Sequence, residues 1–185
     1  SSSAASDVYK RQHTGPAIVF NSYPEMKAAV EDETLDVTAD HIMVFRNAGP
    51  VGGPGMPEWG MLPIPVKLVK QGVRDMLRIS DARMSGTSYG ACILHAAPEA
   101  AIGGPLALVK NGDMIAVDVA ARTLDLLVDE AELQARKQVW QPPEQIVSRG
   151  YHWMSAQHIQ QADKGCDFDF LETTFGKSAG EPDIF

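Results

Sequence analysis

One glycine- and proline-rich stretch constrains the fold of this chain more than any other feature. Residues 47–60 (NAGPVGGPGMPEWG) hold five glycines and three prolines, interleaved so that neither an α-helix nor a regular strand can run through them. Glycine widens the choice of backbone angles and proline removes a hydrogen-bond donor, so the stretch must follow a specific irregular path. The rest of the chain therefore has to supply a scaffold that holds this path.

Glu58 is the only carboxylate within residues 47–60. Two roles are open for it. It is either a charge at the surface or at the start of the next helix, or it is a metal ligand, because a hard cation such as Mg²⁺ binds carboxylate oxygen. The spacing by itself favours neither role.

A second polar stretch follows in residues 78–90 (RISDARMSGTSYG), where a short apolar run leads into a loop with two glycines. The hydroxyls of Ser85 and Thr87 suit either an ordinary Ser/Gly turn or a reactive group presented at the tip of a loop on a rigid scaffold. Arg83 has two possible partners, a substrate carboxylate or Asp81, and we expect the structural pair with Asp81.

Two further polar side chains are candidates for a site. His95 is either an acid/base group or a buried histidine bonded to backbone, and we expect it to be buried. Glu99 is either a charge at a helix start or a site residue, and we expect a structural role. Ser85 and His95 together suggest a serine hydrolase as one hypothesis. The Gly-x-Ser-x-Gly pattern of such enzymes is, however, missing around Ser85.

Hydrophobic runs and turn residues predict many short strands and a few helices, which indicates a compact, β-rich α/β unit. Ser22 followed by Glu25 is a capping-box pattern for the first helix. An Asn-Gly pair at 111–112, between two apolar runs, predicts a tight hairpin. The expected strands are 15–20, 41–45, 76–79, 106–109, 114–119 and 122–128, and the expected helices are 22–31, 63–72, 129–138 and 151–162.

Length and composition narrow the class of protein. The 185 residues, of which 44% are apolar, suffice for one sizeable core. A net charge of -8 argues against broad nucleic-acid contact, and no apolar run is long enough to span a membrane. Cys92 and Cys166 are too few for a disulfide framework and lack metal-ligand spacing, so we expect reduced thiols and a cytoplasmic location.

Four segments, in the same order, resemble the C-terminal part of the dihydroxy-acid and sugar-acid dehydratases, which are iron–sulfur hydro-lyases. The resemblance covers roughly residues 13–185 and is closest to aldonate dehydratases such as arabinonate or xylonate dehydratase. The four segments are residues 46–60 (RNAGPVGGPGMPEWG), 80–87 (SDARMSGT), 97–105 (APEAAIGGP) and 122–128 (RTLDLLV).

The resemblance implies an α/β fold with a β-barrel-like C-terminal domain, peripheral helices and a helical tail. Residues 13–139 would form the barrel-like domain, and residues 140–185 a tail that packs on the domain or on a partner subunit. Residues 1–12 are low in large apolar residues and show no period, so we interpret them as a non-native leader. The chain would then be a C-terminal fragment whose larger N-terminal domain is missing.

The resemblance also implies a reaction, the dehydration of a 2,3-dihydroxy sugar acid to a 2-keto-3-deoxy acid. Ser85 would be the base, Thr87 would bind substrate and Glu58 would be a Mg²⁺ ligand. The iron–sulfur ligands would lie in the missing domain, since Cys92 and Cys166 do not match cluster positions. The fragment alone would be inactive, and the parent a homodimer or homotetramer with no nucleic-acid or membrane partner.

Two alternatives stay open. One is the dihydroxy-acid dehydratase of branched-chain amino-acid biosynthesis. The other is a non-catalytic, β-rich assembly domain in which the glycine-rich stretches only shape an interface.

Overall fold

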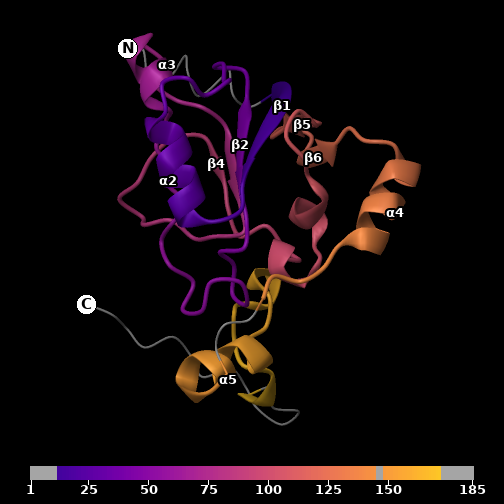
Figure 1. Cartoon of the computed structure of the whole chain (residues 1–185). Helices are drawn as coiled ribbons and strands as arrows, with labels where there is room; N and C mark the ends of the chain where they lie inside the picture. The colour runs from indigo at the N-terminus through magenta and orange to yellow at the C-terminus, as the bar shows by residue number, and fades with distance from the viewer. Residues whose placement is uncertain (1–11, 145–147, 172–185) are drawn as a thin grey trace.

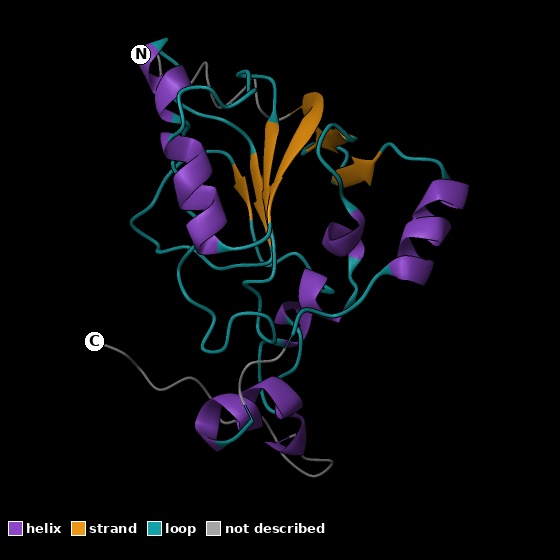
Figure 2. Cartoon of the chain, in the orientation of Figure 1, coloured by secondary structure: helices purple, strands orange, loops and turns teal. Residues whose placement is uncertain are grey.

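A six-stranded mixed sheet forms the centre of the molecule, which we describe from a computed structural model for residues 12–144 and 148–171 (Figures 1 and 2). The strand order is β4-β3-β2-β1-β5-β6. The first four strands are parallel, and β5 is antiparallel to both β1 and β6. The strands are β1 (Gln12–Phe20), β2 (Ile42–Phe45), β3 (Arg78–Ser80), β4 (Cys92–Ile93), β5 (Met114–Asp118) and β6 (Thr123–Leu126).

Two helices cover one face of the sheet. They are α2 (Tyr23–Glu31) and α3 (Val66–Lys70). Met26 and Leu68 are buried there against Phe20 and Phe45 from the strands. The predicted capping of α2 is confirmed, because the Ser22 hydroxyl accepts a hydrogen bond from the Glu25 amide at 3.4 Å. Both helices were expected, although α3 is shorter than residues 63–72.

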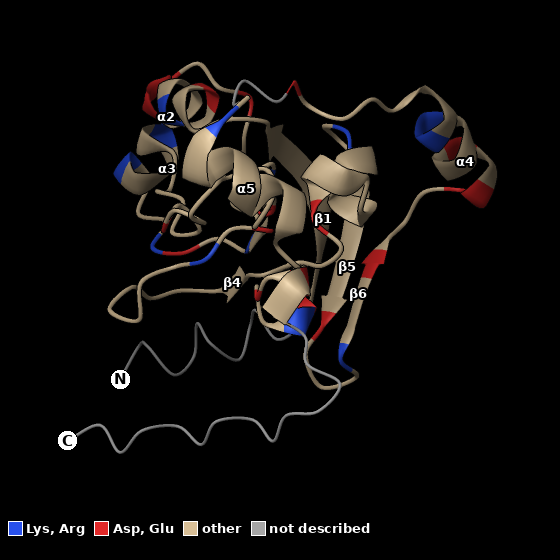
Figure 3. Ribbon diagram, turned by 90° about the horizontal axis from the view of Figure 1, so that it is seen from below, with Lys and Arg blue, Asp and Glu red and all other residues tan. Residues whose placement is uncertain are grey.

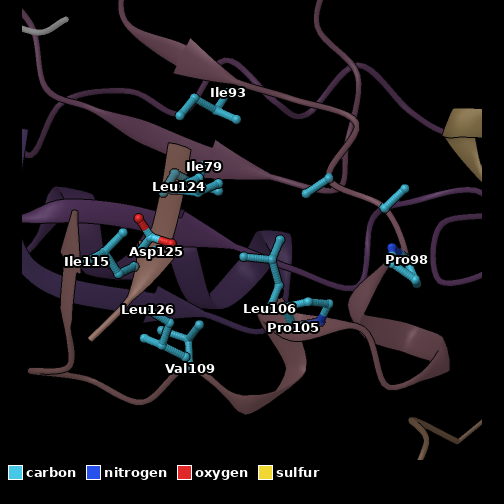
Figure 4. A pocket seen from close by; sticks show the side chains of 12 residues that line it. Ile79, Ile93, Pro98, Pro105, Leu106, Val109, Ile115, Leu124, Asp125 and Leu126 are labelled. Atoms are coloured by element: carbon cyan, nitrogen blue, oxygen red, sulfur yellow. The ribbon is translucent and has the colours of Figure 1, made fainter. Parts of the chain in front are cut away.

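The other face of the sheet is concave. Val19, Val44, Ile79 and Ile115 pack inside it with the short 3₁₀-helix η2 (Pro105–Leu108). The curl brings β3 and β4 to face β6 across an apolar cavity of about 310 Å³ (Figure 4). The sheet is therefore a half-barrel, and the predicted α/β, barrel-like fold is confirmed.

The expected hairpin of residues 106–109 with 114–119 is wrong. Residues 105–108 form η2, and β5 pairs with β1 and β6 instead. The Asn-Gly turn contacts β1, because the Asn111 side chain accepts from the Val19 amide at 2.6 Å and the Gly112 amide donates to the Ala17 carbonyl at 2.8 Å. This docking gives the turn its hydrogen-bond partners on β1, and residues 106–109 therefore do not form a hairpin with β5.

Two helices follow β6, and both were expected. α4 (Glu130–Val139) lies on the side of the sheet opposite α2 and α3, while α5 (Gly150–His158) lies beyond one end of the strands (Figures 1 and 3). The outer helices α2, α3 and α4 carry most of the helical charge, whereas α5 has no Lys, Arg, Asp or Glu (Figure 3). None of the helices in the described ranges is long and apolar enough to cross a bilayer.

The predicted leader, residues 1–12, lies almost entirely outside the described residues and stays a prediction. Gln12, its last residue, begins β1, and its side chain donates a hydrogen bond to Asp118 at 2.7 Å. The strand therefore starts three residues earlier than the expected 15–20.

Candidate active site

Two loops that leave neighbouring parallel strands carry the predicted site residues. We name residues 47–60, which follow β2, the glycine loop, and residues 81–90, which follow β3, the serine loop. Because β2 and β3 are paired and parallel, both loops start at the same edge of the sheet. In open α/β sheets the carboxyl ends of the strands are where ligands bind.

Asp81 fastens the start of both loops. It is fully buried, and its carboxylate accepts hydrogen bonds from three backbone amides, those of Asn47 at 3.1 Å, Ala48 at 3.0 Å and Ala100 at 3.0 Å. Burial raises the pKa of Asp81 above its ordinary value, although the three amides act in the opposite direction. The expected ion pair with Arg83 is therefore wrong, because backbone donors already occupy the carboxylate.

Arg83 links the two loops instead. Its guanidinium donates to the Met56 carbonyl at 2.6 Å and lies 3.3 Å from the Glu58 carboxylate. Its own carbonyl accepts from the Gly60 amide at 2.8 Å. The Arg83 and Glu58 side chains are 46% and 47% exposed, so their pair lies at the surface, where solvent or a ligand can reach it.

Ser85 and Thr87 lie against each other. Their hydroxyl oxygens are 3.0 Å apart, and the Thr87 amide points at the Ser85 hydroxyl from 3.4 Å. The turn is closed by the Ser88 amide, which donates to the Ser85 carbonyl at 3.0 Å. Glu58 lies on the glycine loop, and Ser85 and Thr87 lie on the serine loop. Arg83, two residues before Ser85, links these two loops.

His95 is exposed, so the expectation that it would be buried is wrong. Its backbone is left-handed, with φ of 55°, and its amide donates to the Ala82 carbonyl at 3.2 Å. Among the described residues no hydrogen bond joins it to Ser85, whose hydroxyl contacts Thr87. The pairing that a serine hydrolase would need is not formed.

Glu99 has the structural role that was expected. It is fully buried, and its two carboxylate oxygens accept from the amides of Val51 and Gly52, each at 2.8 Å. The approach is so close that a Cβ atom on Gly49 would lie 2.6 Å from a Glu99 oxygen. Only glycine fits at position 49, which explains part of the composition of the glycine loop.

The tail, which was expected to pack on the domain or on a partner subunit, contacts this region through side chains that the sequence did not single out. The Gln161 side chain accepts from the Glu99 amide at 2.7 Å and donates to the Glu99 carboxylate at 2.8 Å. The Cys166 thiol lies 3.8 Å from the Met56 sulfur, and burial raises the pKa of that thiol. Sixty-two residues separate Gln161 from Glu99, and no local pattern encodes such a contact.

The carboxylates and thiols in and near the two loops are not grouped together. Within residues 12–144 and 148–171, no three His, Cys, Asp or Glu side chains are grouped so that they could hold a metal ion. Glu58 is therefore not part of such a group among the described residues. Cys92 lies beside Arg78, at 3.3 Å, and Cys166 beside Met56, so the two thiols occupy different surroundings.

Comparison with known proteins gives one consistent result. The family model for the C-terminal part of dihydroxy-acid/6-phosphogluconate dehydratases matches residues 2–166. A 6-deoxy-6-sulfo-D-gluconate dehydratase of Pseudomonas putida is 52% identical over 98% of the chain and 31% of its own length. An L-arabinonate dehydratase of Rhizobium leguminosarum is 48% identical over 91% of the chain and 29% of its own. A dihydroxy-acid dehydratase of Methanoregula boonei is 48% identical over 71% of the chain and 23% of its own. The chain therefore spans less than a third of each of these relatives.

Proposed function

Since the chain belongs to the dihydroxy-acid/6-phosphogluconate dehydratase family, whose C-terminal part it matches, we propose that it is part of a sugar-acid dehydratase. The observation that supports a sugar acid is the extent of the matches. Relatives named for sugar acids align with 89–98% of the chain. Four dihydroxy-acid dehydratases among the relatives align with 71–83% of it.

The proposed reaction removes water from a 2,3-dihydroxy carboxylate. A base takes the proton from C2, the hydroxyl leaves C3, and the resulting enol becomes a 2-keto-3-deoxy acid. The difficult steps are the removal of a weakly acidic C–H proton and the departure of hydroxide, so charge has to be stabilised at both ends of the reacting bond.

Ser85 is the proposed base, acting as its alkoxide. A serine hydroxyl is a poor base in water and needs hydrogen-bond donors or cations that stabilise the deprotonated form. The structure supports this role, because both the amide and the hydroxyl of Thr87 lie within 3.4 Å of the Ser85 oxygen and can donate to it. Thr87, exposed beside Ser85, is the proposed substrate-binding residue.

Glu58 is the proposed Mg²⁺ ligand. Its carboxylate fits a hard cation, because it is about half exposed and its ion pair with Arg83 is a single contact of 3.3 Å. When bound, Mg²⁺ would stabilise negative charge on the substrate oxygens and the iron–sulfur cluster would act as a Lewis acid at the C3 hydroxyl. This chain would orient the substrate beside Ser85 and hold Glu58 in place, while the cluster ligands come from the preceding part of the parent chain.

The proposal extends to the assembly. The parent would join this domain to the N-terminal domain of the same chain and form a homodimer or homotetramer. A cytoplasmic location is part of the proposal, because Cys92 and Cys166 are both free thiols, as reducing compartments keep them.

The dihydroxy-acid dehydratase of branched-chain biosynthesis is the second candidate, since such relatives reach 48% identity. A panel of substrates separates the two. The full-length parent, purified without oxygen, is incubated with several aldonates and with 2,3-dihydroxyisovalerate, and 2-keto acid formation is measured. Turnover of an aldonate is the expected result. Turnover of the branched-chain acid alone would contradict the sugar-acid assignment.

A further inference from the structure

The end of the described tail is built as a compact turn. Residues 159–168, which we name the tail turn, are closed by a β-bridge between Ile159 and Phe168. Within it the Gln161 carbonyl accepts from the amides of Lys164 at 2.9 Å and Cys166 at 3.3 Å. These bonds set the direction of the Gln161 and Cys166 side chains, which both reach the barrel-like domain.

Gln161 meets Glu99 with both ends of its amide. The oxygen accepts from the Glu99 backbone and the nitrogen donates to the Glu99 carboxylate. Glu99 has no solvent exposure, and the same carboxylate holds the amides of Val51 and Gly52. A buried carboxylate with several donors is held firmly in place, and removing one donor leaves part of its charge unpaired.

Cys166 reaches the same loop at a second point. Its sulfur is 3.8 Å from the sulfur of Met56, two residues before Glu58. The Met56 carbonyl, in turn, accepts from Arg83, which pairs with Glu58. The tail turn therefore contacts the glycine loop directly near Glu58 and, through Glu99, near Val51.

From these contacts we propose that Gln161 is a positioning residue of the active site. By fixing Glu99, it fixes the backbone of the glycine loop and so the place of the Glu58 carboxylate. The tail turn would thus be part of the metal-binding machinery, although Gln161 is not itself a ligand. This inference rests on the proposed role of Glu58 in binding Mg²⁺.

The test compares Gln161→Met, which keeps the size of the side chain but removes both hydrogen bonds, with the control Lys164→Ala in the same turn, whose side chain is exposed. Both are made in the full-length parent. Hydrogen–deuterium exchange of residues 47–60 is measured first. We expect faster exchange in Gln161→Met and unchanged exchange in Lys164→Ala. Equal exchange in both variants would overturn the positioning role.

Mg²⁺ affinity is the second readout, measured by titration calorimetry without substrate. Outer groups that orient a metal ligand typically change affinity 10- to 100-fold, so we expect Gln161→Met to bind Mg²⁺ about 10-fold more weakly or worse. Glu58→Gln is measured alongside. If Glu58→Gln weakens binding and Gln161→Met does not, the positioning role is wrong and the metal assignment stands. If Glu58→Gln has no effect, the proposed metal role of Glu58 fails, and with it the claim that Gln161 places a ligand.

Discussion

The buried carboxylates of Asp81 and Glu99 hold the glycine loop in place. Asp81 and Glu99 are both fully buried, and between them they accept hydrogen bonds from five backbone amides, of which four belong to the glycine loop. A loop so rich in glycine and proline cannot pair its backbone within a helix or a sheet, and buried backbone donors need partners. The two carboxylates supply them.

Replacing Asp81 with Asn tests this at one residue. Asn has a single acceptor oxygen, so at least one of the three amides would face an NH₂ group and lose its partner. An unsatisfied buried donor costs about 1–3 kcal/mol. Ala48 donates to one oxygen of Asp81 and Ala100 to the other, so we expect the free energy of local opening at one of these two amides, measured by native-state hydrogen exchange, to fall by about that amount. Unchanged exchange at both amides would show that Asp81 does not hold the loops.

The sequence singled out candidate site residues, whose roles stay predictions, but it did not predict the partners of the charged side chains beside them. Glu58, Ser85 and Thr87 stand out because a carboxylate or hydroxyl is conspicuous within a glycine-rich loop. Asp81 and Arg83 look like an ion pair because they are close in sequence, yet the fold buries one and exposes the other. Whether Asp81 and Arg83 pair with each other depends on partners far away in the sequence, and these partners are known only from the fold.

At the scale of elements, regular periodicity predicted most helices and strands but not the way they pair. The buried run of β2 and the capped helix α2 follow from local patterns. The expected hairpin around Asn111 failed because the same turn residues bond to β1. An Asn-Gly pair specifies a tight turn, whereas the partner of that turn depends on the rest of the sheet.

Two side chains of α4 form ion pairs with the rest of the domain, Arg136 with Asp113 and, at the surface, Glu132 with Lys110. None of its residues is fully buried, but Arg136 is only 10% exposed. It forms two bonds to the Asp113 carboxylate, one of them 3.0 Å long, and one to the Leu108 carbonyl at 2.8 Å. Paired hydrogen bonds between a guanidinium and a carboxylate are among the strongest in proteins.

Arg136→Ala should release this helix. Hydrogen bonds to charged groups contribute about 1.5–3 kcal/mol, so we expect local stability at α4 to fall by that amount. Faster hydrogen exchange in residues 130–139 would show it. The control is Lys137→Ala, which removes the exposed neighbour and should leave exchange unchanged. Similar effects of the two variants would argue that Arg136 is not the attachment point.

Acid should release α4 as well. Burial acts to raise the pKa of Asp113, but the hydrogen bond from Arg136 and that from the Lys110 amide outweigh it, so the pKa lies below the ordinary 3.8. The stabilisation is therefore complete above pH 3.8 and is lost as the pH falls through the lowered pKa. Exchange at α4 should rise in that range, and Asp113→Asn should abolish the rise. A release of α4 that begins above pH 5 would contradict this account.

At the scale of the whole molecule, the structure is half of a barrel, and the chain spans less than a third of the length of the relatives reported above. Within the described ranges β4 and β6 are the edge strands of the sheet, and they face each other across an apolar cavity. The candidate site likewise holds the proposed base and one proposed metal ligand but no grouped metal ligands among the described residues. Both features are those expected of a part that functions together with another part.

We therefore expect that the 185 residues alone neither turn over a sugar acid nor bind an iron–sulfur cluster. Iron and acid-labile sulfide are measured after anaerobic reconstitution of the isolated chain and, as the control, of the full-length parent. The parent should hold both in stoichiometric amounts. Stoichiometric iron and sulfide on the isolated chain would refute the assignment of the cluster ligands to the missing part.

The central claim is that this chain supplies the base of the dehydratase, and Ser85→Ala in the full-length parent tests it most directly. Ser88→Ala, in the same loop, is the matched control, and iron, sulfide and Mg²⁺ contents are verified for both. General bases typically contribute about 10²–10⁴-fold to a rate, so kcat on the preferred aldonate should fall at least 10²-fold in Ser85→Ala and little in Ser88→Ala. Full turnover by Ser85→Ala would show that the serine loop shapes the site without acting as the base.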